Sequence, residues 1–306
     1  MVIRCLIAAL LALHTTLACA LDVRFEPIAE NVYVYIGDTG GRSAQNQGLN
    51  ANLGLVVTPQ GAVLIDSGAT WQSARLIDDA VRRVTTQPVR WVINTGGQDH
   101  HWLSNGYFQG RGAELISHAS ALPDMRARGG EQLEALRRLL GTAADDTVPV
   151  LPMRLIEGAD ARLDFGGSVF ELRHRGGGHT PGDMMVWLPQ SKLLFAGDIV
   201  YVDRLLAVIP VSNTRNWLAA FAVIETLAPT KIVPGHGRVT DLATAQAQTR
   251  DYLAALRKCM KRAVDEGLDP SAAARSFDGK AWGQLLNAAE LMPGNASRVY
   301  LEVERE

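Results

Sequence analysis

The chain has 306 residues, of which 47% are hydrophobic and 20% are charged, and its formal net charge is −2. This composition is that of an ordinary globular protein, long enough for one large domain or two small ones. The near-neutral charge and the lack of a basic stripe argue against nucleic acid as a partner.

Residues 1–20 have the features of an export signal. Arg4 supplies a positive charge, residues 5–13 form a short apolar core, and Ala18-Cys19-Ala20 fits the pattern of a cleavage site. We expect cleavage before Leu21 and a periplasmic mature protein. Lipidation at Cys19 and a retained membrane anchor are the alternatives, and no later segment has the roughly 18 apolar residues of a membrane helix. Only Cys259 remains after cleavage, so an internal disulfide is excluded.

The first block of the mature chain predicts strands with two helices between them. Apolar runs bounded by turn residues predict strands over 24–28, 31–37, 51–57, 62–66, 91–94 and 114–117. Helical spacing of apolar residues predicts a helix over 71–85, and an Arg-rich helix is expected over 119–140. The Gly-rich stretch 38–47 predicts an exposed loop.

The second block repeats this plan. Strands are expected over 155–156, 161–165, 169–173, 184–188, 193–196 and 231–233, with a helix over 216–227 and further helices over 241–266 and 280–292. Two such blocks predict an α/β fold in which two sheets pack together between outer helices, a four-layer αββα sandwich with its site at one edge. We expect a single domain over 21–306 that includes the C-terminal helices 241–306.

Side chains suited to a metal ion follow several of the predicted strands. His100 and His101 lie in QDHHWLSN, His179 lies in GGGHTPGDM, Asp198 lies in FAGDIV and His236 lies in PGHG. Zinc prefers imidazole nitrogen and carboxylate oxygen, and a catalytic site keeps a position open for water. Two ions about 3.5–4 Å apart need a bridging group, which an Asp after a strand can provide. Together these loops predict a metal centre.

Each residue taken singly has a plainer interpretation. A lone His in a loop is more often a surface residue than a ligand, and Asp198 could cap a turn. His118 could be a residue at the start of a helix or a side chain that contacts a metal ligand without binding the metal itself. His174 is expected in the core or at the surface. The joint occurrence of the four loops, each at a strand end, favours the metal centre.

These motifs resemble the metallo-β-lactamase-fold hydrolase superfamily over roughly residues 30–240. The matching features are Asp66 in LIDSG, VINT before the first ligand loop, and the motifs GHTPG, GD and PGHG, in the expected order. The resemblance implies that His179, Asp198 and His236 are metal ligands, that Asp198 bridges two ions, and that Asp66 is a structural acid near the site. Among exported members, the chain resembles the zinc metallohydrolases associated with sulfur oxidation and periplasmic quinoproteins.

The first ligand loop departs from the family pattern His-x-His-x-Asp-His, because GGQDHH follows Asn-Thr here. Two alignments stay open. Without a gap, Gly96 and Gln98 replace the two first-site histidines, His100 replaces the Asp, and His101 keeps the last His. With a one-residue deletion, Asp99 and His100 keep the Asp-His pair. Both alignments predict a first metal site that is weak or empty, with Gln98 at best a weak ligand.

The predicted function is hydrolysis of an ester, thioester or amide-like small molecule by metal-activated water. One or two zinc ions are expected, with iron and manganese as alternatives. Asp99, or His100 if it is not a ligand, would accept the proton, and the loop 38–50 would cover the substrate. The alternatives are a non-catalytic, accessory metal-binding protein of a periplasmic oxidation system and, with less support, a β-lactamase.

Overall fold

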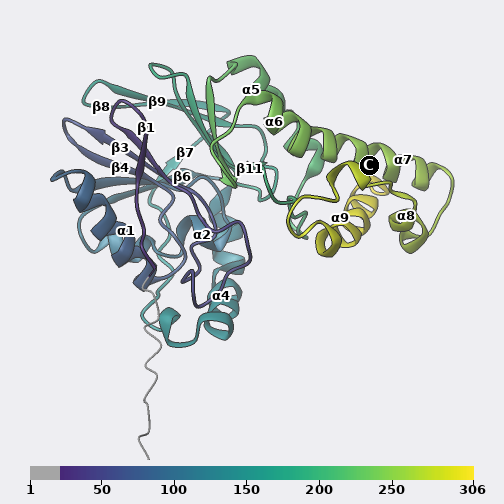
Figure 1. The fold of residues 1–306 in the computed structure, drawn as a ribbon, viewed down its shortest axis with the longest axis horizontal. Coiled ribbons are helices and arrows are strands. Elements are labelled where there is room, and N and C mark those ends of the chain that lie inside the picture. The colour runs from purple at the N-terminus through teal and green to yellow at the C-terminus, as the bar shows by residue number, and fades with distance from the viewer. Residues whose placement is uncertain (1–20) are drawn as a thin grey trace, which may run out of the picture.

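The computed structural model describes residues 21–306, so the predicted export segment 1–20 lies outside the described residues. Two β-sheets pack face to face, and helices cover the outer side of each sheet (Figure 1). This arrangement confirms the predicted four-layer αββα architecture. None of the helices described within 21–306 is long and apolar enough to cross a membrane.

The first sheet contains seven strands in the order in which they occur along the chain. The strands from β1 to β4 pair antiparallel through short turns, whereas β4 to β7 pair parallel because helices connect them. The bounds are β1 (Glu26–Ala29), β2 (Val32–Tyr35), β3 (Leu53–Thr58), β4 (Gly61–Ile65), β5 (Val89–Ile93), β6 (Glu114–His118) and β7 (Arg154–Ile156).

The second sheet contains five strands in the order β12-β11-β10-β9-β8. The strands from β8 to β11 pair antiparallel, and β12 joins β11 in parallel after the crossover helix α5 (Thr214–Leu227). The bounds are β8 (Asp160–Phe165), β9 (Ser168–His174), β10 (Met184–Leu188), β11 (Leu193–Tyr201) and β12 (Lys231–His236).

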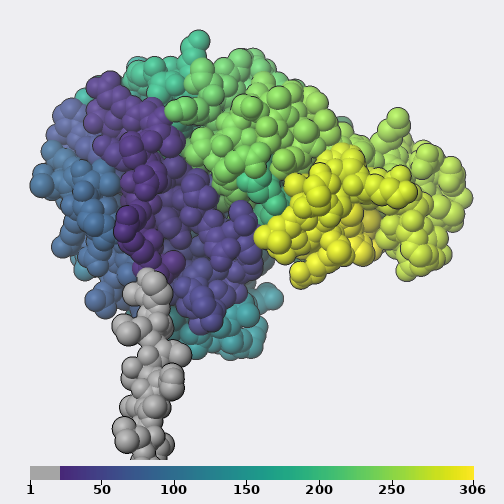
Figure 2. All heavy atoms as spheres, in the orientation of Figure 1, coloured from purple at the N-terminus to yellow at the C-terminus, as the bar shows by residue number. Residues whose placement is uncertain are grey.

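The other helices divide between the two sheets. Those of the first half are α1 (Trp71–Val84), α2 (Asp99–Trp102), α3 (Asn105–Gln109), α4 (Ala121–Leu140) and the turn η1 (Gly141–Ala144). Those of the C-terminal part are α6 (Leu242–Ala245), η2 (Gln246–Arg250), α7 (Asp251–Asp265), α8 (Pro270–Ser276), η3 (Lys280–Trp282) and α9 (Ala288–Val303). The C-terminal helices form a lobe at the side of the sandwich (Figure 2). Their apolar faces share one buried cluster with α5 and β11, so this lobe is continuous with the second sheet's core.

Several predicted elements differ from the observed ones. The first ligand loop folds as the short helices α2 and α3, which are too brief to produce a helical period in the sequence. The strand β11 continues through Asp198 to Tyr201, so Asp198 lies inside a strand and not after it. Gly197 permits this course, because its φ of 51° is in the left-handed region that favours glycine. The last helix spans Ala288–Val303, where 280–292 was expected, and α8 was not predicted.

Two histidines join the sheets near the site. His118 at the end of β6 and His174 at the end of β9 stack with ring centroids 3.6 Å apart. Burial lowers the pKa of both, although hydrogen bonds from His118 to the Gly158 carbonyl and from His174 to the Asp183 carbonyl oppose the shift. Both rings are therefore neutral in the folded state at neutral pH.

Stability should consequently fall in acid. A lowered folded-state pKa means that the unfolded chain binds protons first, so the stability is complete above the ordinary His pKa of about 6.5 and decreases as the pH falls below it. We expect His118→Phe with His174→Phe to reduce this loss, because phenyl rings stack without titrating. Urea unfolding at about pH 7.5 and about pH 5 measures the difference. An unchanged loss of unfolding free energy in the double variant would contradict the assignment.

Candidate metal centre

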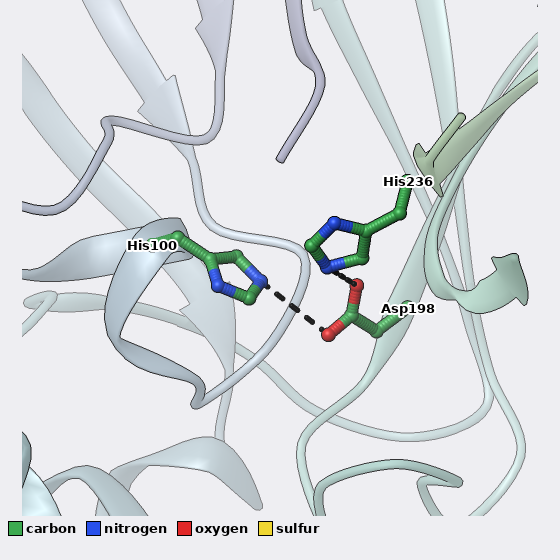
Figure 3. Close-up of side chains that lie close together, drawn as sticks. All are labelled: His100, Asp198 and His236. Atoms are coloured by element: carbon green, nitrogen blue, oxygen red, sulfur yellow. Dashed lines mark ion pairs between the residues drawn. The ribbon is translucent and has the colours of Figure 1, made fainter. Parts of the chain in front are cut away.

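The structure brings all five predicted ligands together around one carboxylate. The Nε2 atoms of His100 and His101 each lie 3.4 Å from Oδ2 of Asp198, and Nε2 of His179 lies 3.5 Å from the same oxygen. His236 approaches the other oxygen, with Nε2 3.5 Å from Oδ1 (Figure 3). None of the five residues is more than 3% exposed. The arrangement therefore forms a compact, buried cluster of four imidazoles and one acid.

The cluster forms where several elements end at one edge of the sandwich. His100 and His101 come from α2, His179 follows β9, and His236 is the last residue of β12. The strand β12 can lie this close to Asp198 because its residue 235 is glycine. A Cβ atom at Gly235 would stand 2.2 Å from Oδ1 of Asp198, closer than real contacts allow.

Each imidazole of the cluster is oriented through its Nδ1 atom. The Nδ1 partners are the Asp99 carboxylate at 3.2 Å for His100, the Asp66 carboxylate at 2.9 Å for His101, the Ala207 carbonyl at 2.8 Å for His179 and the Asn50 carbonyl at 2.6 Å for His236. The carbonyl acceptors at Nδ1 of His179 and His236 fix the proton on that nitrogen and leave Nε2 unprotonated, which is the form that binds a metal. Nδ1 of His100 lies near both a carboxylate and the Arg42 guanidinium, which can only donate, so its proton is not fixed in this way. The four rings thus present Nε2 to the centre of the cluster.

Asp198 has no hydrogen-bond donor for either carboxylate oxygen among residues 21–306, although both oxygens are buried. Burial alone would raise the pKa of Asp198, but His101, His100 and His236 hold it well below its ordinary value. A buried, ionised carboxylate without donors is unfavourable unless a cation lies beside it. Imidazole and carboxylate donors suit zinc, and also iron and manganese. The residues present therefore fit a divalent metal ion.

The protonation of the histidines also suits a ligand set. Burial lowers the pKa of His179 to about 4 and that of His236 well below its ordinary value, although Asp198 opposes both shifts. Both are therefore neutral at pH 7, as metal ligation requires. His101 differs from these two: burial would lower its pKa, but Asp66 and Asp198 together raise it well above the usual range. Its ring therefore holds a second proton beside Asp198, which it would have to release to bind an ion.

Asp99 does not face Asp198. It pairs with Arg42 from the loop 38–50, and Nη2 of Arg42 also lies 3.0 Å from Nδ1 of His100. Burial alone would raise the pKa of Asp99, but Arg42 and His100 hold it well below its ordinary value. A carboxylate paired in this way is a poor proton acceptor at neutral pH, so the geometry does not fit the predicted catalytic role of Asp99. It fits the alignment without a gap, in which His100 and His101 both face the centre.

Asp183, in the connection between β9 and β10, lies at the position of the first missing histidine, residue 96. A Cβ atom at Gly96 would lie 2.7 Å from Oδ1 of Asp183. Asp183 is held there by Thr180, which donates from its backbone amide at 2.8 Å and from its hydroxyl. Burial raises the pKa of Asp183 to about 7, although the hydrogen bonds from Thr180 oppose this shift.

The position of the second missing histidine is also unavailable. Oε1 of Gln98 accepts a hydrogen bond from Nη1 of Arg128 at 3.3 Å and so does not join the cluster. Arg128 pairs with Asp124, and a Cβ atom at Gly97 would lie 2.5 Å from Oδ2 of that acid. A hydrogen-bonded protein network thus surrounds the positions of the two missing histidines, and Gln98 is not placed as a ligand.

The C-terminal helices reach the site through the segment 203–208. Asn295 in α9 is fully buried, donates to the Leu206 carbonyl at 2.8 Å and accepts from the Val208 amide at 2.8 Å. Between these two contacts lies Ala207, whose carbonyl orients His179. Sequence reasoning missed Asn295 and Arg42, because a buried Asn or a loop Arg carries no motif that marks its partner. It also missed Asp183, although that acid lies in the motif GGGHTPGDM.

Replacing Asn295 should therefore disturb both stability and metal binding. We expect Asn295→Leu to lower the unfolding free energy by about 2 kcal/mol or more, because it leaves buried backbone groups without partners. Metal affinity should fall about 10-fold through the loosened His179. Urea unfolding and competitive metal titration measure the two effects, with Ser297→Ala on the same helix as the control. Unchanged metal affinity despite lower stability would show that α9 does not support the ligand.

Comparison with known proteins agrees with this geometry. The sequence model of the Metallo-beta-lactamase superfamily matches residues 46–236. The metallo-beta-lactamase IND-1 of Chryseobacterium indologenes is 24% identical over 218 residues, covering 69% of this chain and 80% of that protein. An acyl-coenzyme A thioesterase of Gallus gallus is 24% identical over 117 residues, covering 37% of this chain and 42% of that protein.

Solved structures share the fold at low identity. The sec-alkylsulfatase Pisa1 from Pseudomonas sp. superposes with a TM-score of 0.74 and 17% identity, and the match covers 91% of this chain. The present chain spans about half of that protein, with 50% covered. A metallo-beta-lactamase from Pontibacter korlensis superposes with a TM-score of 0.61 and 20% identity over 76% of this chain and 99% of that one.

Proposed function

Because the chain belongs to the metallo-beta-lactamase superfamily, we propose that it is a hydrolase that depends on one divalent metal ion. His100, Asp198 and His236 would hold the ion, since their facing atoms all lie within 4.8 Å of one another. His101 and His179 complete the set at Oδ2 of Asp198. The observation that carries the proposal is the buried Asp198 carboxylate, which has four imidazoles around it and no hydrogen-bond donor in residues 21–306.

When bound, the ion would supply Lewis-acid polarisation and a nucleophilic water at neutral pH. The chain's own residues prepare for this role by fixing the imidazoles. The Ala207 and Asn50 carbonyls keep the Nδ1 protons of His179 and His236, so both rings offer unprotonated Nε2 atoms. Asp183 and its neighbours fill the first-site space, which is why we propose one ion and not two.

The substrate would be a small molecule with an ester or thioester bond. The relatives and structural neighbours carry the names of β-lactamases, a thioesterase and a sec-alkylsulfatase, so the family supports hydrolysis but not one particular bond. We further propose that the protein acts in the periplasm with zinc as its ion. Membership in the branch associated with sulfur oxidation and quinoproteins stays a prediction.

Metal removal and reconstitution test this function. The purified protein is assayed on a panel of thioester, lactone, β-lactam and sulfate-ester substrates, then treated with a chelator, and then reloaded with zinc, iron or manganese. We expect turnover of at least one class, loss on chelation and recovery with one metal. Turnover that persists after complete metal removal would refute the metal dependence. Metal binding without turnover of any class would favour the accessory metal-binding protein instead.

A further inference from the structure

A groove of about 930 Å³ lies between the start of α5 and the helix α9. None of the five residues of the metal-centre cluster lines it. Its volume is within the range of about 300–1,000 Å³ that small-molecule sites occupy. The groove is therefore a candidate binding site separate from the cluster. Its walls include Val208, Ser212 and Arg215 on one side and Arg298, Glu302 and Arg305 on the other.

Three arginines border the groove without an acidic partner. Arg215 is the second residue of α5, Arg298 lies in α9, and Arg305 lies two residues beyond the end of that helix. No carboxylate within residues 21–306 lies within ion-pair distance of any of the three, and residues 1–20 contain neither Asp nor Glu. Because a guanidinium stays protonated at any physiological pH, the three positive charges persist.

The two glutamates of the groove are already engaged by other groups. Glu302 caps the start of α5, because it accepts from the Thr214 amide at 2.9 Å and from the Thr214 hydroxyl at 2.8 Å. Arg257 pairs with Glu302 at 3.0 Å and with Glu306 at 2.8 Å. With Arg257 included, four arginines stand against two glutamates, which leaves an excess of two positive side-chain charges. A concave site with such an excess concentrates anions.

One wall of the groove also holds a residue of the metal centre, His179. Ser212 donates from its hydroxyl to the His179 carbonyl at 2.8 Å. Arg298 donates to the Val208 carbonyl at 2.9 Å, and the neighbouring Ala207 carbonyl orients the His179 ring. The groove and the metal centre therefore share one segment of the chain.

We propose that this groove binds a small dianion, either a tetrahedral oxyanion or a dicarboxylate, and that the bound dianion strengthens the hold on His179. Each guanidinium offers paired N–H donors to an oxyanion, so one ligand can link Arg215 on the first wall with Arg298 and Arg305 on the second. Such a link holds the segment that orients His179 against α9, and metal affinity should rise. Dianion binding does not depend on the proposed hydrolase activity, whereas the effect on metal affinity rests on the proposed metal centre.

Calorimetric titration of the purified full chain with sodium sulfate and, separately, sodium succinate tests the site. Ionic strength is held constant with sodium chloride, because salt screens nonspecific attraction. We expect Arg215→Gln with Arg305→Gln to bind the preferred dianion at least about 5-fold more weakly than wild type. Arg75→Gln with Arg137→Gln is the matched control, because both of these arginines are exposed but lie on α1 and α4. Equal melting temperatures show that the variants are folded.

The same proteins test the effect on the metal centre. Competitive zinc titration with and without saturating dianion should show about 5-fold tighter zinc binding by wild type and no change in the double variant, since two coupled sites affect each other equally. Equal dianion affinity in wild type and the double variant, or no binding above the chloride background, would overturn the site. Zinc affinity that the dianion leaves unchanged would overturn the coupling. Dianion binding that depends on these arginines, in a protein that binds no metal, would support the groove while refuting the metal centre.

Discussion

Asp198→Asn is expected to abolish metal-dependent hydrolysis and metal-induced stabilisation together. The amide keeps the shape of the carboxylate but removes its charge and places an NH2 group among four imidazoles. Loss of a group that hydrogen-bonds a metal ligand typically lowers metal affinity or activity by about 10–100-fold. Loss of Asp198, the central group of the cluster, should therefore lower activity by more than about 100-fold. Turnover on the best substrate of the panel measures the first effect. The rise in melting temperature on zinc addition measures the second, because a ligand that binds only the folded state stabilises it.

Asp203→Asn is the matched control for this variant. Asp203 lies five residues further along, is more exposed, and pairs with Arg238 away from the cluster. The control should keep activity and the zinc-induced rise in melting temperature. An Asp198→Asn protein that retains either property would mean that the metal lies elsewhere.

The second large effect is expected when the family's motif is restored. Gly96→His with Gln98→His reproduces the two missing histidines, but we expect a less stable protein without a second ion. A Cβ atom at residue 96 would meet Oδ1 of Asp183 at 2.7 Å, and Thr180 holds that acid in place. Overpacking of this kind costs about 1–3 kcal/mol. Urea unfolding and metal analysis of the purified variant measure both expectations.

Gln98→His alone separates the two positions. Its side chain replaces one that contacts Arg128 at 3.3 Å, and it avoids the conflict between a Cβ atom at residue 96 and the Asp183 carboxylate. We expect this single variant to lose less than about 1 kcal/mol of unfolding free energy and to bind no second ion. A double variant that bound two ions at wild-type stability would show that Asp183 and Asp124 move aside, and the account of a filled first site would be wrong.

Much of the fold was predictable because its strands are short apolar runs separated by turn residues. The αββα architecture follows from that pattern, and the strand predictions overlap every strand of both sheets. The misplaced elements have no periodic signal: α2 and α3 span four and five residues. Within β11, the left-handed Gly197 lets the strand continue to Tyr201, which apolarity alone does not indicate.

The site was predictable only in part. The motifs around His179, Asp198 and His236 identify those residues, and the structure places them together with His100 and His101. The choice between the two alignments of the first loop required the side chains, because a shift by one residue exchanges the roles of Asp99 and His100. Arg42 lies far from these motifs in sequence, so only the folded chain shows that it borders the cluster.

Metal stoichiometry is the most direct test of the central claim. The protein is purified anaerobically, and its metal content per chain is determined by mass spectrometry, with His236→Ala analysed in parallel. The account predicts about one divalent ion per wild-type chain and a large loss in the variant, because His236 is one of the proposed ligands. Wild-type protein without zinc, iron or manganese would contradict the metal centre. Two ions per chain would contradict the filled first site.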